Sequence, residues 1–132
     1  MKALRIAGPS EAAARLRCLG GDAGSVRAVA FFAGTGTAKA AFVSAWSAVA
    51  REGDRLICWP RRLLTLEDIA RKVVRLRLCG MTAALVEVRP SDIPEGLNVL
   101  IETAATRELP LILMDRDPGP LFAVHHSGGA TA

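Results

Sequence analysis

A glycine-rich segment of this chain has the residue types of a loop that holds a phosphate group. The segment reads Ala33-Gly34-Thr35-Gly36-Thr37-Ala38-Lys39-Ala40, and it lies between a predicted strand and a predicted helix. In such a loop, glycines let backbone N–H groups approach the phosphate, and a lysine meets its outer oxygens. Alanine replaces two glycines of the full pattern and its Mg²⁺-binding Ser/Thr, at Ala33, Ala38 and Ala40. The segment is either an ordinary strand-to-helix turn or a degenerate nucleotide-binding loop that uses Gly34, Gly36, Thr37 and Lys39.

A second group of candidate residues is basic, and it includes 8 of the 17 lysines and arginines: Arg51, Arg55, Arg61, Arg62, Arg71, Lys72, Arg75 and Arg77. Arg61 and Arg62 follow a predicted strand, at the edge where open parallel sheets bind their ligands. Arg71, Lys72 and Arg75 share one face of a predicted helix, and these five cations are candidates to bind phosphate groups. The alternative is a solvated helix face on which Glu67 pairs with Arg71.

Side chains for acid–base, nucleophilic or metal chemistry are sparse. The chain has no tyrosine, and its two histidines, His125 and His126, are adjacent in a glycine-rich tail. Glu87, Asp115 and Asp117 follow predicted strands, so a carboxylate site is the one acid–base alternative. We therefore predict no catalytic residues, no metal site and no cofactor.

Charge and composition narrow the classes of partner. The net charge of +4 divides into +8 over residues 1–86 and −4 over residues 87–132. A basic half suits an anionic partner such as nucleic acid, or it is an ordinary solvated surface. The sequence predicts neither a membrane span nor a signal peptide, which indicates a cytoplasmic protein. Its three cysteines, Cys18, Cys58 and Cys79, are predicted to be reduced thiols in the core.

Short apolar runs alternate with helical patterns along the chain. Strands are predicted at residues 3–7, 26–33, 55–59, 82–88 and 110–114. Helices are predicted at residues 11–19, 37–51, 65–78 and 94–107, the first capped by Ser10 and the third by Thr65. This order predicts an α/β fold: a single three-layer domain over residues 1–117 with a mostly parallel sheet of about five strands, flavodoxin-like in layout. A Pro/Gly-rich tail occupies residues 118–132.

Four segments, in order over roughly residues 3–109, resemble the catalytic domain of serine recombinases, the resolvase/invertase family. Ala33–Ala40 is similar to the family's Gly-x-Ser-Gly-x-Lys loop. Glu52–Trp59, followed by Arg62-Leu63, Asp68-Ile69 and Gly80, resembles its Glu-Gly-Asp, strand, Asp-Arg-Leu, helix and Gly pattern. Ile93–Leu97 resembles its Thr-Pro-x-Gly-x-Leu helix start. The resemblance implies a resolvase-like sheet core.

The departures from that family concern its chemistry. The family's first strand ends in a serine that attacks DNA, and the resemblance places Ala7 at that position, which has no oxygen to form a phosphoserine link. Arg61 stands where the family has an aspartate, and the resemblance leaves only Arg5 and Arg62 of its phosphate-binding arginines. Prolines 110, 118 and 120 break the family's long dimerisation helix. The resemblance thus implies a recombinase core without strand cleavage.

These observations favour a non-catalytic recombinase-like module, accessory or regulatory in a DNA transaction, that binds the DNA backbone without sequence specificity or binds a protein partner. Its candidate phosphate-binding residues are Arg5, Arg61, Arg62, Arg71, Lys72 and Arg75. One alternative is a protein–protein or assembly subunit, homo-oligomers included, without DNA contact, for which Trp46, Trp59 and Phe122 are candidate anchors although core packing is favoured for both tryptophans. The other is the degenerate nucleotide-binding protein.

Overall fold

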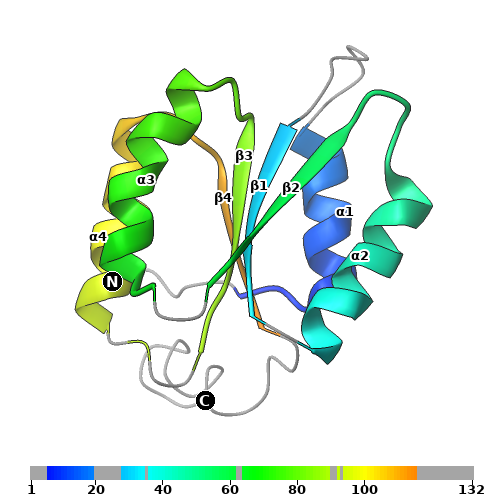
Figure 1. Cartoon of the computed structure of the whole chain (residues 1–132), viewed down its shortest axis with the longest axis horizontal. Coiled ribbons are helices and arrows are strands. Elements are labelled where there is room, and N and C mark those ends of the chain that lie inside the picture. The colour runs from blue at the N-terminus through cyan, green and yellow to red at the C-terminus, as the bar shows by residue number, and fades with distance from the viewer. Residues whose placement is uncertain are drawn as a thin grey trace.

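The computed structural model describes residues 6–19, 28–34, 36–61, 64–89, 92 and 94–115. Four strands alternate with four helices in the order α1 (Pro9–Leu19), β1 (Ala28–Ala33), α2 (Thr37–Val49), β2 (Arg55–Pro60), α3 (Leu66–Leu78), β3 (Ala83–Glu87), α4 (Pro94–Thr106) and β4 (Leu111–Met114). All strand pairs are parallel, in the order β2-β1-β3-β4. Helices α1 and α2 cover one face of the sheet, and α3 and α4 cover the other (Figure 1). The predicted three-layer α/β fold is confirmed.

The first predicted strand is reduced, within the described residues, to a single bridge between Ala7 and Met114. The Ala7 N–H donates to the Leu113 carbonyl at 2.9 Å, and the Asp115 N–H donates to the Ala7 carbonyl at 2.9 Å. Ala7 therefore lies beyond β4, with β3 and β4 between it and β1. The order of β1 to β4 is the flavodoxin-like 2-1-3-4, and Ala7 takes the next position along the sheet.

Strand β1 is buried along its whole length because it has neighbours on both edges and helices on both faces. Val29 and Phe31 pack toward α1 and α2, whereas Ala30 and Phe32 pack toward α3 and α4. Strand β2 lies at the edge of the sheet, where a proline is tolerated because one side of the strand has no hydrogen-bonded neighbour among the described strands. The Arg61 N–H donates to the Ala33 carbonyl, so Pro60, one residue earlier, presents its missing N–H to the unpaired edge.

Two predictions about this architecture are wrong. Helix α1 begins at Pro9, so Ser10 lies in its first turn rather than at its cap; proline suits a first turn, where its missing N–H has no partner to lose. The three cysteines are free, as predicted, but all are exposed. Cys18 lies in the last turn of α1, Cys58 on the edge strand, and Cys79 at the cap that ends α3. No helix in the described part of the chain is long and apolar enough to cross a membrane.

Candidate functional site

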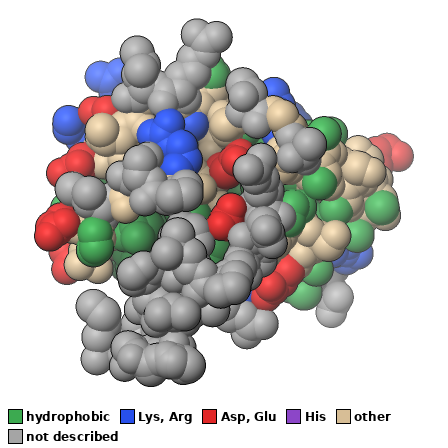
Figure 2. Space-filling model, turned by 90° about the horizontal axis from the view of Figure 1, so that it is seen from below, with side chains coloured by type: hydrophobic (Ala, Val, Ile, Leu, Met, Phe, Trp, Pro, Cys, Tyr) green, Lys and Arg blue, Asp and Glu red, His purple; other side chains and the backbone are tan. Residues whose placement is uncertain are grey.

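The carboxyl ends of the strands gather most of the candidate residues at one end of the molecule. From β1 the chain crosses to β2 on one side and then returns to β3 on the other side. Open α/β sheets bind ligands at such a switch point, here between the ends of β1 and β3. Figure 2 looks onto this end and shows acidic side chains near its middle.

The glycine-rich turn after β1 is held by a carboxylate of its own chain. Glu87 Oε1, at the end of β3, accepts a hydrogen bond from the Gly34 N–H at 2.9 Å. A Cβ at Gly34 would lie 3.3 Å from both carboxylate oxygens, so no side chain separates the two groups. A phosphate bound in this turn would compete with the negative charge of Glu87 for the same amide. This contact disfavours the nucleotide-binding alternative.

The rest of that turn offers a glycine backbone, as a phosphate-binding loop does, but few side chains that could contact a phosphate. Gly36 is the N-cap of α2, with φ 95° and no side-chain hydrogen bond to the cap. Lys39 is exposed in the first turn of α2. Thr35 lies outside the described residues, as does the side chain of Thr37. No metal-binding group of three or more His, Cys, Asp or Glu residues occurs in the described part of the chain.

Arg61 is the one buried charged residue among those described, with 0% of its surface exposed. Its side chain follows the two-residue alternation of Ile57 and Trp59, which pack toward α3 and α4. Arg61 Nη1 donates to the Glu87 carbonyl at 2.7 Å and to Asp92 Oδ2 at 2.7 Å, and Nη2 donates to Asp92 Oδ1. Because β1 lies between β2 and β3, this side chain spans the carboxyl end of β1.

Asp92 joins Arg61 to the loop that follows β3. Its side chain is 6% exposed, and Oδ2 also accepts a hydrogen bond from the Arg89 N–H at 2.8 Å. Arg89 Nη2 in turn donates to the Leu64 carbonyl at 3.1 Å. The loop that leads into α3 and the loop that leads into α4 are thereby tied together. We call Arg61, Asp92 and Arg89 the Arg61 cluster.

The position of Arg61 corrects its predicted role as a phosphate ligand. Both terminal nitrogens of the guanidinium donate to Asp92 inside the protein, and the residue has no exposed surface. Arg5 and Arg62, the other predicted phosphate-binding arginines that do not belong to α3, lie outside the described residues. In the described part of this end of the sheet, the charged groups therefore bind one another rather than a phosphate.

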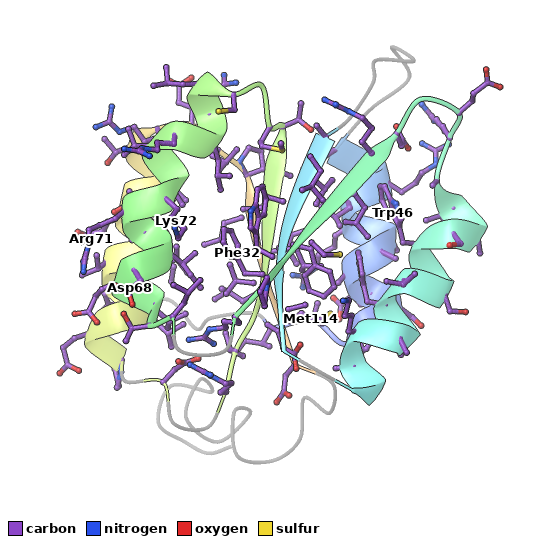
Figure 3. The ribbon with its side chains drawn as sticks, viewed as in Figure 1. Phe32, Trp46, Asp68, Arg71, Lys72 and Met114 are labelled. Atoms are coloured by element: carbon purple, nitrogen blue, oxygen red, sulfur yellow. The ribbon has the colours of Figure 1, made fainter. Side chains whose placement is uncertain are left out.

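Helix α3 presents the remaining basic candidates. Arg71, Lys72 and Arg75 are exposed, and we call them the basic face of α3. The opposite side of α3 buries the predicted stripe Leu66, Ile69, Ala70, Val73 and Leu76, with Leu76 rather than Arg77 as its last member. In Figure 3, Arg71 points away from the sheet, and Lys72 lies on the side of α3 nearest the viewer.

One cation of the basic face has an internal partner. Arg71 Nη2 donates to Asp68 Oδ1 at 3.1 Å, so the predicted pair with Glu67 is wrong. Asp68 is already fixed by the helix cap, which places its carboxylate one turn before Arg71. The Arg71 side chain is 70% exposed, so this pair is screened by solvent and weak. Lys72 and Arg75 form no ion pair with any described residue.

A capping box fixes where α3 begins and therefore where its basic face points. The Asp68 N–H donates to Thr65 Oγ1 at 3.1 Å, and the Thr65 N–H donates to Asp68 Oδ2 at 2.9 Å. The hydrogen bonds from the Thr65 backbone and hydroxyl hold the pKa of Asp68 below its ordinary value of 3.8. The charged form of Asp68 therefore stabilises the fold above that value, and the contribution is lost as pH falls through the lowered pKa.

Thr65→Ala is expected to lower the free energy of unfolding at neutral pH by about 1 kcal/mol. Asp68→Asn should also flatten the acid side of the stability profile, because the titrating group of the cap is gone. Urea unfolding followed by circular dichroism measures the first effect at pH 7 and the second between about pH 5 and pH 2. Glu67→Gln, which removes a neighbouring carboxylate outside the cap, is the matched control. Equal losses with falling pH in Asp68→Asn and in the wild type would contradict the assignment.

The remaining candidates of the sequence are structural in the described residues. Trp46 is buried, and Trp59 stacks on Phe32 with ring centroids 5.5 Å apart, so the core packing favoured for both tryptophans is confirmed. Ala7, which the resemblance places at the recombinase nucleophile position, is buried beside β4. Asp115 follows β4 and donates its N–H to the Ala7 carbonyl. Asp117, Phe122 and both histidines lie outside the described residues.

Comparison of the chain with protein-family models, with curated proteins and with solved structures found no match. The resemblance to serine recombinases therefore rests on the sequence motifs alone.

Proposed function

We propose that the protein is a non-catalytic, recombinase-like module that contacts the phosphate backbone of DNA through the basic face of α3. Its role in a DNA transaction is accessory or regulatory, because alanine stands at the recombinase nucleophile position. The observation that carries the proposal is the exposure of three cations on consecutive turns of one helix, two of them without an ion pair to any residue that the structure describes. Such a face neutralises phosphates without reading bases, so binding is independent of sequence.

The charges at the carboxyl end of the sheet are already paired inside the protein. This favours α3, rather than that end, as the surface that contacts DNA. Arg61 already pairs with Asp92, and the Gly34 amide already donates to Glu87. Either group would have to lose an internal anion before it could meet a phosphate. Lys72 and Arg75 of α3 pair with no described anion and need no such rearrangement, and the exposed pair of Arg71 with Asp68 is weak. We also propose a cytoplasmic location, because three exposed thiols without a disulfide are typical of a reducing compartment.

Titration of the protein into labelled duplex DNA at several salt concentrations tests the proposal. Three phosphate contacts predict a slope of log K against log [salt] of about −2.7, or about a 40-fold loss of affinity between 50 and 200 mM salt. Lys72→Glu with Arg75→Glu should reduce the slope to about −0.9 and weaken binding at every salt concentration.

The matched control is Arg17→Glu with Lys39→Glu, which changes the net charge equally on the α1/α2 side of the sheet. This control should bind DNA more tightly than the α3 variant does. Absence of binding at low salt would refute the proposal. Equal losses in the two variants would show that net charge, rather than the basic face, drives the interaction.

A further inference from the structure

We infer that the outer surface of the α3/α4 layer is a self-association surface, on which the basic face of α3 meets acidic residues of α4 in a second copy of this chain. This inference stands apart from the proposed DNA contact. Only the competition with DNA, described below, rests on that contact, because both use the basic face of α3.

Helix α4 is the acidic counterpart of α3 in the same layer. Glu95 and Glu102 are exposed and lie seven residues apart, which places them on one side of the helix; we call them the acidic face of α4. Helix α4 contains no lysine or arginine. The left margin of Figure 2 shows the division, with basic side chains toward the top and most of the acidic ones below. The layer therefore carries positive charge along α3 beyond its first turn, which holds Glu67 and Asp68, and negative charge along α4.

The two helices are packed side by side and in register. Both follow strands of a parallel sheet, so they run in the same direction. A Cβ at Gly96 would lie 3.2 Å from the Leu66 Cβ, which sets these two residues at one level. Glu102 lies six residues after Gly96, and Lys72 lies six residues after Leu66. With the same rise per residue in both helices, Glu102 is level with Lys72.

This arrangement makes the surface complementary to itself. A two-fold axis parallel to the helices, along the seam between them, places α3 of each copy over α4 of the other. The operation preserves the level of every residue, so the basic face of α3 meets Glu102 of the second copy, and the reverse contact forms at the same time. Closed two-fold dimers require such a self-complementary patch.

Exposed apolar side chains accompany both charged faces. Leu78 is 82% exposed and lies three residues after Arg75, on the same side of α3. Val99 is 41% exposed and lies between Glu95 and Glu102 on the outer side of α4. Single exposed apolar residues are normal on protein surfaces, so the argument rests on the charges. A dimer with this symmetry would also remove Val99 from water, which adds to its stability.

Self-association and DNA contact exclude each other because they cover the same cations. Dimer formation would therefore withdraw the basic face of α3 from DNA, and the free monomer would be the form that binds phosphate. Both interactions are electrostatic and weaken with salt. A series of protein concentrations, rather than of salt concentrations, therefore distinguishes self-association from DNA contact.

Sedimentation equilibrium at low salt tests the surface with two charge-reversed variants. The α3-reversed variant carries Lys72→Glu and Arg75→Glu, and the α4-reversed variant carries Glu95→Lys and Glu102→Lys. The wild type is expected to show an average mass that rises with concentration, whereas each variant alone stays at the mass of one chain. An equimolar mixture of the two variants should regain the dimer, because the glutamates introduced on α3 of one variant then face the lysines introduced on α4 of the other, and Glu102 of the first faces the unchanged basic face of the second. Recovery in the mixture is a result that misfolded variants cannot produce.

The control Arg17→Glu with Lys39→Glu, on the other side of the sheet, should associate like the wild type. A wild-type mass that stays at one chain up to about 1 mM protein would overturn the inference. So would a mixture of the two reversed variants that remains monomeric.

DNA titrations of the same variants separate this inference from the proposed function. The α4-reversed variant keeps the basic face and should bind DNA at least as tightly as the wild type. Recovery of the dimer without DNA binding by any variant would refute only the proposed function. DNA binding by the α4-reversed variant without recovery of the dimer would refute only the self-association surface.

Discussion

Arg61→Ala is expected to lower the free energy of unfolding by about 3–5 kcal/mol, as the loss of one partner of a buried ion pair does. Asp92, with a side chain only 6% exposed, would keep its negative charge without the guanidinium that offsets it. The Glu87 carbonyl would lose its donor from Arg61 as well. Urea unfolding measures the change as a lower midpoint, with the slope unchanged if both proteins unfold in two states.

Comparison variants separate the ion pair from the rest of the arginine. Arg61→Lys keeps a positive charge but cannot donate to both oxygens of Asp92 in a fork, so we expect a loss smaller than that of Arg61→Ala. A double-mutant cycle with Asp92→Ala should show that the two losses overlap, because each single change leaves the other charge buried. Arg75→Ala, on the exposed face of α3, should change stability by no more than about 0.5 kcal/mol. A loss in Arg61→Ala no larger than that in Arg75→Ala would contradict the role given to the Arg61 cluster.

The sequence predicted the elements of this fold well because their signals are local. Helix α3 was predicted to follow a cap at Thr65 and to end at Leu78, and it does so, since the capping box and the apolar stripe lie within one helix. Helix α2 was predicted over residues 37–51 and ends at Val49. Strand order has no comparable local signal. Ala7 lies beside β4 because residues more than 100 positions apart pair there, and no propensity encodes that contact.

The candidate site was predicted in part. Residue type cannot tell the buried Arg61 from the exposed Arg71, and the partner of Arg61 is 31 residues away in another loop. One signal for its burial is present in the sequence. The alternation of Ile57 and Trp59 continues one step beyond Pro60, and it directs Arg61 to the same face of the sheet. The cysteines show the opposite error, because they were predicted to be buried and are exposed. Cys58 has apolar neighbours in the sequence but is not part of the core.

Phe42→Ala is expected to lower the free energy of unfolding by about 3–5 kcal/mol, through a cavity between α2 and the sheet. Phe42 is 0% exposed, and its ring lies edge-on to Phe31 with centroids 4.8 Å apart. It also stacks on Trp46 at 6.3 Å, so the substitution removes two ring contacts together with the buried area. Urea unfolding gives the loss, and the fluorescence of Trp46 reports the change in its surroundings.

Val43→Ala is the matched control, because it shortens the next residue of the same helix at a position that is 37% exposed. It should cost well under about 1 kcal/mol. A loss of stability in Phe42→Ala as small as that in Val43→Ala would mean that α2 does not pack on the sheet as described. Because α2 lies across the sheet from the basic face of α3, folded Phe42→Ala protein should keep the salt-dependent DNA affinity of the wild type. Lys72→Glu with Arg75→Glu should show the reverse pattern, with stability kept and affinity reduced, since those side chains are exposed and lie outside the apolar core.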